Sequence, residues 1–145
     1  MDVEHELLVP GPAEEVFARF ATASGLDAWW TKTSRADPRV GGIYHFGFDA
    51  AHQWQGTVRV FVPARAIDWE MTQTTPMHDW LGTRVGAVLT PEGPQTRLHF
   101  YHRGWEGPTP HQRISSFCWA MYLRLLARNV AHGEVVPYER RNELC

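Results

Sequence analysis

The chain lacks the features that mark several large classes of protein. Its net charge is −2 and its longest basic run is Arg140-Arg141, so it offers no electrostatic basis for binding nucleic acid or an anionic membrane. No stretch approaches the roughly 18 apolar residues of a membrane span. The first residues also lack the basic and apolar segments of a signal peptide. We therefore expect no nucleic-acid partner, no membrane partner and a cytoplasmic location.

Cysteine pairs and metal-binding motifs are also scarce. The two cysteines, Cys118 and Cys145, form no CxxC motif and predict no disulfide framework. Cys118 lies in an apolar helical pattern, so we expect it to be buried. The eight histidines include no HExxH motif, and His99 and His102 would point to opposite faces of one predicted strand. We expect no metal site and no cofactor.

Aromatic residues, in contrast, are abundant. Seven tryptophans occur in 145 residues, a length typical of one domain. A chain of this length buries roughly two-thirds of its unfolded surface, and burying one large ring stabilises a fold by about 2–3 kcal/mol. The rings can therefore be simple core residues, or they can surround a hollow in the domain.

Alternation of apolar and polar residues predicts most of the secondary structure as strands. The runs begin with residues 3–9 and continue after residue 40 over 43–48, 54–62, 67–72, 83–89 and 96–102. Short connections between the later runs predict antiparallel neighbours. Two short helices are expected between the first and second strands, over residues 12–20 and 22–30.

A longer helix is predicted near the C-terminus. Thr109 is suited to cap it, Pro110 to occupy its first position and Gly133 to end it. About 20 residues would span about 30 Å, enough to cross a whole sheet. We expect its core-facing side to include residues such as Phe117, Met121 and Leu125.

This order of elements predicts an α+β domain. A curved six-stranded antiparallel sheet would wrap around the long C-terminal helix, with two short helices after the first strand. We expect one domain over residues 1–134 and a C-terminal tail over residues 135–145.

Several short motifs follow the same order along the chain. They are Trp29-Trp30, Asp37-Pro38-Arg39-Val40-Gly41-Gly42, Gly56-Thr57-Val58 with Pro63, Thr96-Arg97-Leu98, His102-Arg103-Gly104-Trp105 and Trp119. Together with the element order, they resemble the START-like (SRPBCC) superfamily and its helix-grip fold. The branch that the chain resembles is related to activators of the ninety-kilodalton heat-shock chaperone ATPase. The resemblance runs from Val9 to about Gly133.

The resemblance implies a cavity between the sheet and the long helix. In this superfamily such a cavity holds lipids, sterols, polyketides or other apolar molecules, or carries cyclase or hydrolase chemistry. We therefore expect a small apolar or aromatic molecule as the partner, with a cyclase- or hydrolase-type enzyme as the alternative.

An interaction with a chaperone ATPase is a further implication of the resemblance. The eukaryotic activators carry an additional N-terminal domain that helps to engage the chaperone, whereas this chain starts at its first strand, which speaks against that role. We also expect a homodimer, formed through exposed rings such as Trp30 or Trp80.

Residues that would line the cavity follow from the inward-facing positions of the strands and the long helix. The predicted ligand-binding residues are Trp30, Tyr44, Phe46, Trp54, Trp69, Val85, Phe100, His102, Trp105, Phe117 and Met121.

Three of the candidate features have two readings each. His102 is either a polar or acid–base group in the cavity or a structural histidine at the end of a strand. Trp29-Trp30 is either a cavity lid or a pair divided between core and surface. Arg39 either clamps an anionic ligand or forms a turn salt bridge with Asp37.

Overall fold

The computed structural model describes residues 2–145 and confirms the α+β class. The strands are β1 (Val3–Val9), β2 (Thr33–Arg35), β3 (Ile43–Gly47), β4 (Gln53–Val62), β5 (Ala66–Gln73), β6 (Arg84–Glu92) and β7 (Gln95–Arg103). The helices are α1 (Ala13–Ala21), α2 (Ala23–Asp27), η1 (His78–Trp80), α3 (Pro110–His132), α4 (Tyr138–Arg141) and η2 (Asn142–Leu144). All strand pairs are antiparallel, in the order β1-β7-β6-β5-β4-β3-β2.

The sheet has seven strands rather than the predicted six. The additional strand is β2, which has three residues and pairs with β3 at the edge of the sheet. Its sequence is Thr33-Ser34-Arg35, which has no apolar alternation. A strand this short and polar carries no periodic signal, so only its pairing with β3 defines it.

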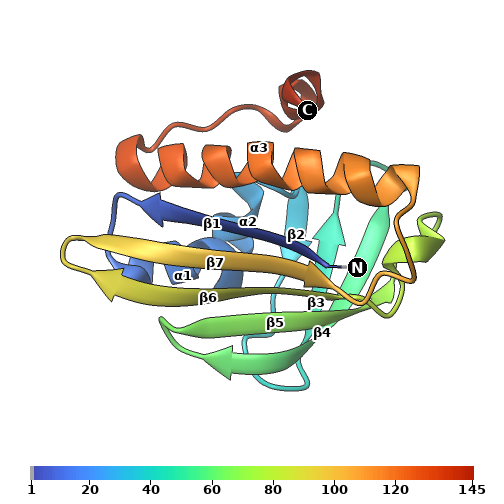
Figure 1. The fold of residues 1–145 in the computed structure, drawn as a ribbon, viewed down its shortest axis with the longest axis horizontal. Coiled ribbons are helices and arrows are strands. Elements are labelled where there is room, and N and C mark those ends of the chain that lie inside the picture. The colour runs from blue at the N-terminus through green and yellow to red at the C-terminus, as the bar shows by residue number, and fades with distance from the viewer. Residues whose placement is uncertain (1) are drawn as a thin grey trace.

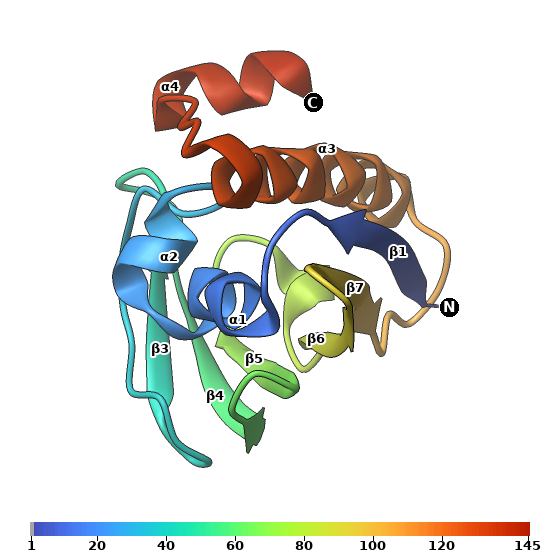
Figure 2. The same ribbon diagram turned by 90° about the vertical axis from the view of Figure 1, so that its left-hand side faces the viewer.

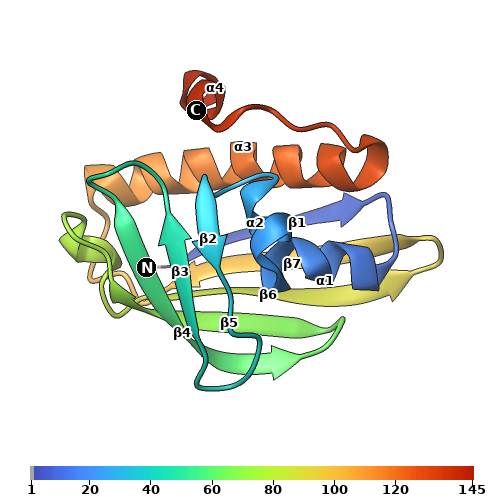
Figure 3. The ribbon, with the colours of Figure 1, turned by 180° about the vertical axis from the view of Figure 1, so that it is seen from behind.

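The sheet curves around the short helices, and α3 lies across its open side (Figures 1 and 2). The view from behind shows α1 and α2 inside this curve, beneath α3 (Figure 3). The edge strand β1 pairs with β7 and also contacts α3, so this edge of the sheet lies against the long helix. This arrangement is the predicted grip of the sheet on the C-terminal helix.

The ends of α3 confirm the predicted capping. The Thr109 hydroxyl accepts a hydrogen bond from the Gln112 amide, Pro110 begins the helix, and Gly133 ends it in the left-handed region at a φ of 67°.

Of the three residues expected on the core-facing side of α3, Leu125 is buried and Met121 is partly buried against the core, but Phe117 is exposed. The buried residues of α3 are Gln112, Ser115, Trp119, Leu123, Leu125, Leu126 and Asn129.

Phe117, which was expected to face the core, is 65% exposed, and Ile114 is 60% exposed. The prediction was wrong because apolar residues occur on nearly every side of this helix, so periodicity alone does not select the buried side. Trp119 of α3 packs against Phe100 of β7 and against Trp30, which follows α2. These contacts set the rotation of the helix.

The C-terminal residues turn back over α3, on its side away from the sheet (Figure 1). Arg141 is buried here, and its guanidinium donates hydrogen bonds to the backbone oxygens of Val136, Thr31 and Asp27. This one side chain therefore attaches α4 to the segment that follows α2.

A disulfide joins Cys118 on α3 to Cys145, with 5.1 Å between the Cα atoms. The prediction that the two cysteines form no disulfide was wrong, and Cys118 is half-buried rather than buried. The pair was not apparent in the sequence because the reversal after Gly133 brings residues together that are 27 positions apart.

The core lies between the inner face of the sheet and the helices, and all seven tryptophans are buried in it. Gly56 leaves space for neighbouring rings, because a Cβ there would lie 3.1 Å from both Phe46 and Trp69. Trp69 carries the only buried side-chain nitrogen or oxygen without a hydrogen-bond partner among residues 2–145.

Candidate functional site

Side chains fill the middle of the domain, where the cavity was expected. Of the predicted ligand-binding residues, seven lie in this packed interior: Tyr44, Phe46, Trp69, Val85, Phe100, His102 and Trp105. Trp119 reaches into this region from α3, with its ring centroid 4.5 Å from that of Phe100 and 4.9 Å from that of Trp30. Because these rings contact one another directly, they act as packing residues in this structure.

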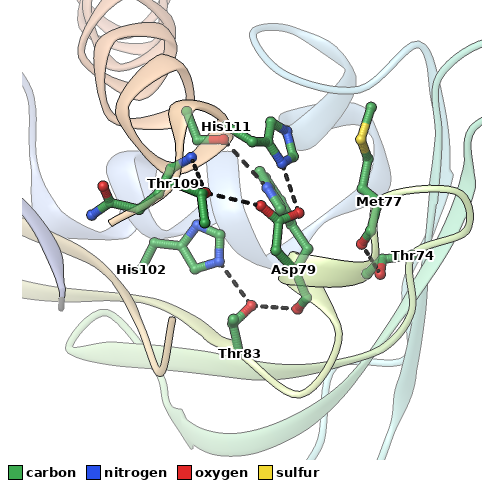
Figure 4. Close-up of polar contacts among 10 residues, drawn as sticks. Thr74, Met77, Asp79, Thr83, His102, Thr109 and His111 are labelled. Carbon is green, nitrogen blue, oxygen red and sulfur yellow. Dashed lines mark hydrogen bonds and ion pairs between the residues drawn. The ribbon is translucent and has the colours of Figure 1, made fainter. Parts of the chain in front are cut away.

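His102 is completely buried, at 0% exposure, and each of its ring nitrogens has a partner. Figure 4 shows the contact between His102 and Thr83. The Trp119 indole N–H donates to Nδ1 at 3.2 Å, so Nδ1 is unprotonated. The Thr83 hydroxyl donates its proton to the Trp80 carbonyl at 2.5 Å and therefore accepts from Nε2–H of His102 at 2.8 Å. The hydrogen bonds thus fix the Nε2–H tautomer of a neutral imidazole.

Electrostatics agree with this assignment. Burial, with a smaller contribution from His111, lowers the pKa of His102 to about 3. Its two side-chain partners, Thr83 and Trp119, do not titrate near neutral pH. The environment of His102 therefore matches the structural reading and not that of an acid–base group.

An open pocket of about 250 Å³ lies to one side of this interior, under α4 and against the N-terminal half of α3. Six parts of the chain form it: the segment after α2, the turn between β3 and β4, β4, η1, α3 and the C-terminal segment. Its lining residues are Trp30, Phe48, Asp49, His52, Trp54, Trp80, His111, Ile114, Ser115, Cys118, Trp119, Tyr122, Tyr138 and Asn142.

Trp30 and Trp54 are the predicted site residues that reach this pocket. Phe117 points away from it on the exposed side of α3, and Met121 is half-buried without lining it. Trp30 and Trp80 are buried at 4% and 6% exposure, so the expectation that they are exposed rings for self-association was wrong. Trp29 is buried, with its indole N–H donating to the Arg19 carbonyl.

Two histidines of the pocket are each held by a carboxylate. His111 Nδ1 lies 2.7 Å from Asp79 Oδ1, and the Thr109 hydroxyl donates to the other oxygen of Asp79 at 3.3 Å (Figure 4). In the turn between β3 and β4, His52 Nδ1 lies 2.7 Å from Asp49 Oδ1. That hydrogen bond, followed by donation from the Ala51 amide, lowers the pKa of the Asp49 carboxyl.

Sequence reasoning missed these four polar residues. Asp49 and His52 are three positions apart in one turn, a local signal that could have been found. Asp79 and His111 are 32 positions apart and meet only because η1 packs beside the start of α3. Nothing in their spacing indicates this contact.

Arg39 does not take part in the pocket. Its guanidinium forms an exposed salt bridge with Asp37, with 3.0 Å between Nη2 and Oδ2, as the turn reading expected. Among residues 2–145, no three or more His, Cys, Asp or Glu side chains gather closely enough to hold a metal ion. No helix in the same part of the chain is both long and apolar enough to span a membrane.

One family of known proteins matches most of the sequence. The family described as "Activator of Hsp90 ATPase homolog 1-like protein" matches residues 10–131. None of the curated proteins matches the chain.

Solved structures share the fold over nearly the whole chain. The Aha1 dimer from Colwellia psychrerythraea has a TM-score of 0.83 and 23% identity, over 92% of this chain and 98% of that chain. The AHSA1-like protein from Aeromonas hydrophila has a TM-score of 0.71 and 19% identity, over 92% and 94%. DynU16, a putative protein in the dynemicin biosynthetic locus, has a TM-score of 0.77 and 18% identity, over 94% and 50%. At these identities the likeness shows a common fold.

Proposed function

Since this chain belongs to the family of activator of Hsp90 ATPase homolog 1-like proteins, we propose that it binds a small apolar or aromatic molecule in the pocket under α4. The observation that supports this proposal most is the aromatic lining of an opening that remains beside a packed interior. Indole and phenyl faces from three separate segments meet there, at Phe48, Trp54 and Trp80. Ligand sites in proteins are commonly concave and mostly apolar, with a few polar groups that orient the ligand.

The size of the pocket limits the ligand. A volume of about 250 Å³ suits a guest of one or two fused rings better than a long lipid or a sterol. The proposed site also differs in position from the predicted one, because it opens beside α4 and the N-terminal half of α3, whereas the predicted cavity lay between the sheet and the long helix.

Calorimetric titration with 2-methoxynaphthalene, an apolar bicyclic probe, tests the proposal. We expect saturable binding to the unmodified protein. Ile114→Glu should weaken it at least tenfold, because it places a charge at the pocket on a side chain that is already 60% exposed and therefore adds little folding cost.

Phe117→Glu is the matched control, since Phe117 is 65% exposed on the same helix but lies outside the pocket. Its affinity for the probe should equal that of the unmodified protein. Absence of binding to the unmodified protein, or equal losses in both variants, would contradict the proposal.

Two further proposals rest on the relatives. The family description supports stimulation of a chaperone ATPase, which an ATPase assay with the purified chaperone tests; an unchanged ATPase rate removes it. The dimeric structure from Colwellia psychrerythraea supports a homodimer, which sedimentation equilibrium tests; a monomer at all concentrations removes it.

A further inference from the structure

The pocket contains two histidines, His52 and His111. In both of them, the ring nitrogen available to a ligand is Nε2. Nδ1 of His111 lies against Asp79, and Nδ1 of His52 lies against Asp49. No hydrogen bond joins Nε2 of either ring to another residue within 2–145. Any polar contact that these rings make to a ligand is therefore made through Nε2.

The carboxylates determine whether Nε2 donates or accepts a hydrogen bond. An ionised carboxylate only accepts hydrogen bonds, so each Nδ1 must carry the proton that it donates. Asp49 Oδ1 also accepts from the backbone amides of Ala51 and His52, and Asp79 Oδ2 accepts from the Thr109 hydroxyl, which indicates that both carboxylates are acceptors. In the neutral imidazole the second nitrogen is then unprotonated and is itself an acceptor.

His102 provides an internal comparison. There a donor, the Trp119 indole, holds Nδ1, so Nε2 carries the proton and is used inside the protein. At His52 and His111 the partner on Nδ1 is an acceptor, so the assignment of the proton is reversed. The pocket therefore presents two hydrogen-bond acceptors on aromatic walls.

We propose that the pocket selects a hydroxylated aromatic molecule, a phenol or naphthol, whose O–H donates to Nε2 of His111 or His52 while its ring packs on the tryptophans. This proposal rests on the proposed binding function and names the class of ligand. A phenolic hydroxyl also accepts hydrogen bonds, and the Tyr138 hydroxyl and the Asn142 amide, which also line the pocket, are able to donate them. Asn142 Oδ1 already accepts from the Tyr122 hydroxyl, which leaves its amide N–H groups as the available donors.

The test compares 2-naphthol with 2-methoxynaphthalene by calorimetric titration at pH about 8, above the ordinary pKa of histidine. The two probes share a ring system, but only the naphthol has a hydrogen to donate. We expect the naphthol to bind roughly three- to tenfold more tightly, the usual size of the effect of one hydrogen bond.

The double variant H52F/H111F should bind both probes equally, because phenylalanine keeps a ring of similar size and removes the acceptor nitrogens. His99→Phe is the matched control: His99 also pairs with a carboxylate, that of Glu4 at 3.1 Å, but it lies outside the pocket. In this control the preference for naphthol should be unchanged. Circular dichroism and thermal unfolding establish that each variant is folded.

Three results would overturn the inference while leaving the binding function intact. They are equal affinity of the unmodified protein for the two probes, a preference for naphthol that persists in H52F/H111F, and tighter binding of 2-naphthoate than of 2-naphthol. The last result would mean that the histidines act as donors to an anion. Failure of both uncharged probes to bind would instead overturn the proposed binding function itself.

Discussion

His102 and His111 lie nine positions apart in sequence and both rings lie beside Trp80, yet their surroundings differ in nearly every respect. The ring of Trp80 lies 4.5 Å from that of His102 and 6.5 Å from that of His111. His102 is completely buried with both ring nitrogens bonded, whereas the His111 side chain is 31% exposed and bonded through one nitrogen. The comparison shows that aromatic rings, Trp80 among them, separate the packed interior around His102 from the open pocket that His111 lines.

We interpret this difference as one between a structural role for His102 and the proposed binding role for His111. A buried neutral histidine with two internal partners contributes to folding and has no nitrogen left for a ligand. A partly exposed histidine that a carboxylate holds in one orientation adds little to stability and keeps one nitrogen for a ligand. The predictions below test this division.

The largest effect is expected from His102→Ala. The substitution leaves a cavity and removes the partner of the buried Trp119 N–H, so the free energy of unfolding should fall by about 4 kcal/mol. His111→Ala, the control, breaks a partly exposed pair and should cost about 0.2–1 kcal/mol. Urea unfolding measures both values, and equal losses would contradict the comparison.

Acid should destabilise the protein through His102. Its pKa is about 3 when folded and about 6.5 when unfolded, so between these values the unfolded chain binds more protons. The stability that the neutral, buried His102 contributes is therefore fully present above about pH 6.5. As the pH falls below this value, the free energy of unfolding decreases by about 1.4 kcal/mol for each pH unit.

Urea unfolding of the unmodified protein and of His102→Gln across pH 4.5–6.5 measures this slope. The glutamine variant, which does not titrate, should show a smaller dependence on pH. The same slope in both proteins would show that His102 does not titrate as its burial requires.

A smaller difference is expected between two tryptophans of the interior. Trp119→Phe leaves Nδ1 of His102 as a buried acceptor without its donor, whereas Trp69→Phe removes an N–H that has no partner. The two substitutions remove similar volume, so Trp119→Phe should cost about 1–2 kcal/mol more than Trp69→Phe. Chemical denaturation of the two variants at neutral pH checks this order.

Much of the fold could be predicted from local patterns. Alternation marked the six longer strands, and Thr109, Pro110 and Gly133 marked the ends of α3, because capping and turn chemistry depend on neighbouring residues. The short edge strand β2 could not be predicted, since its pairing with β3 alone makes it a strand.

The candidate site could be predicted much less well. Two of the predicted ligand-binding residues, Trp30 and Trp54, line the pocket, but Phe117 faces outward, because a helix that is apolar on all sides has no single periodic face. The disulfide between Cys118 and Cys145 depends on a chain reversal that no spacing rule gives.

The sequence by itself determined the order of elements, the family and the presence of a ring-rich core, since these depend on short-range periodicity and motifs. Only the tertiary structure decided whether those rings enclose space or fill it. Side-chain packing depends on the rotation of α3 and on contacts between distant residues, such as Asp79 with His111. For the same reason, the proton positions on His102 and His111 follow from partners that are distant in the chain, whereas His52 is held by Asp49 within its own turn.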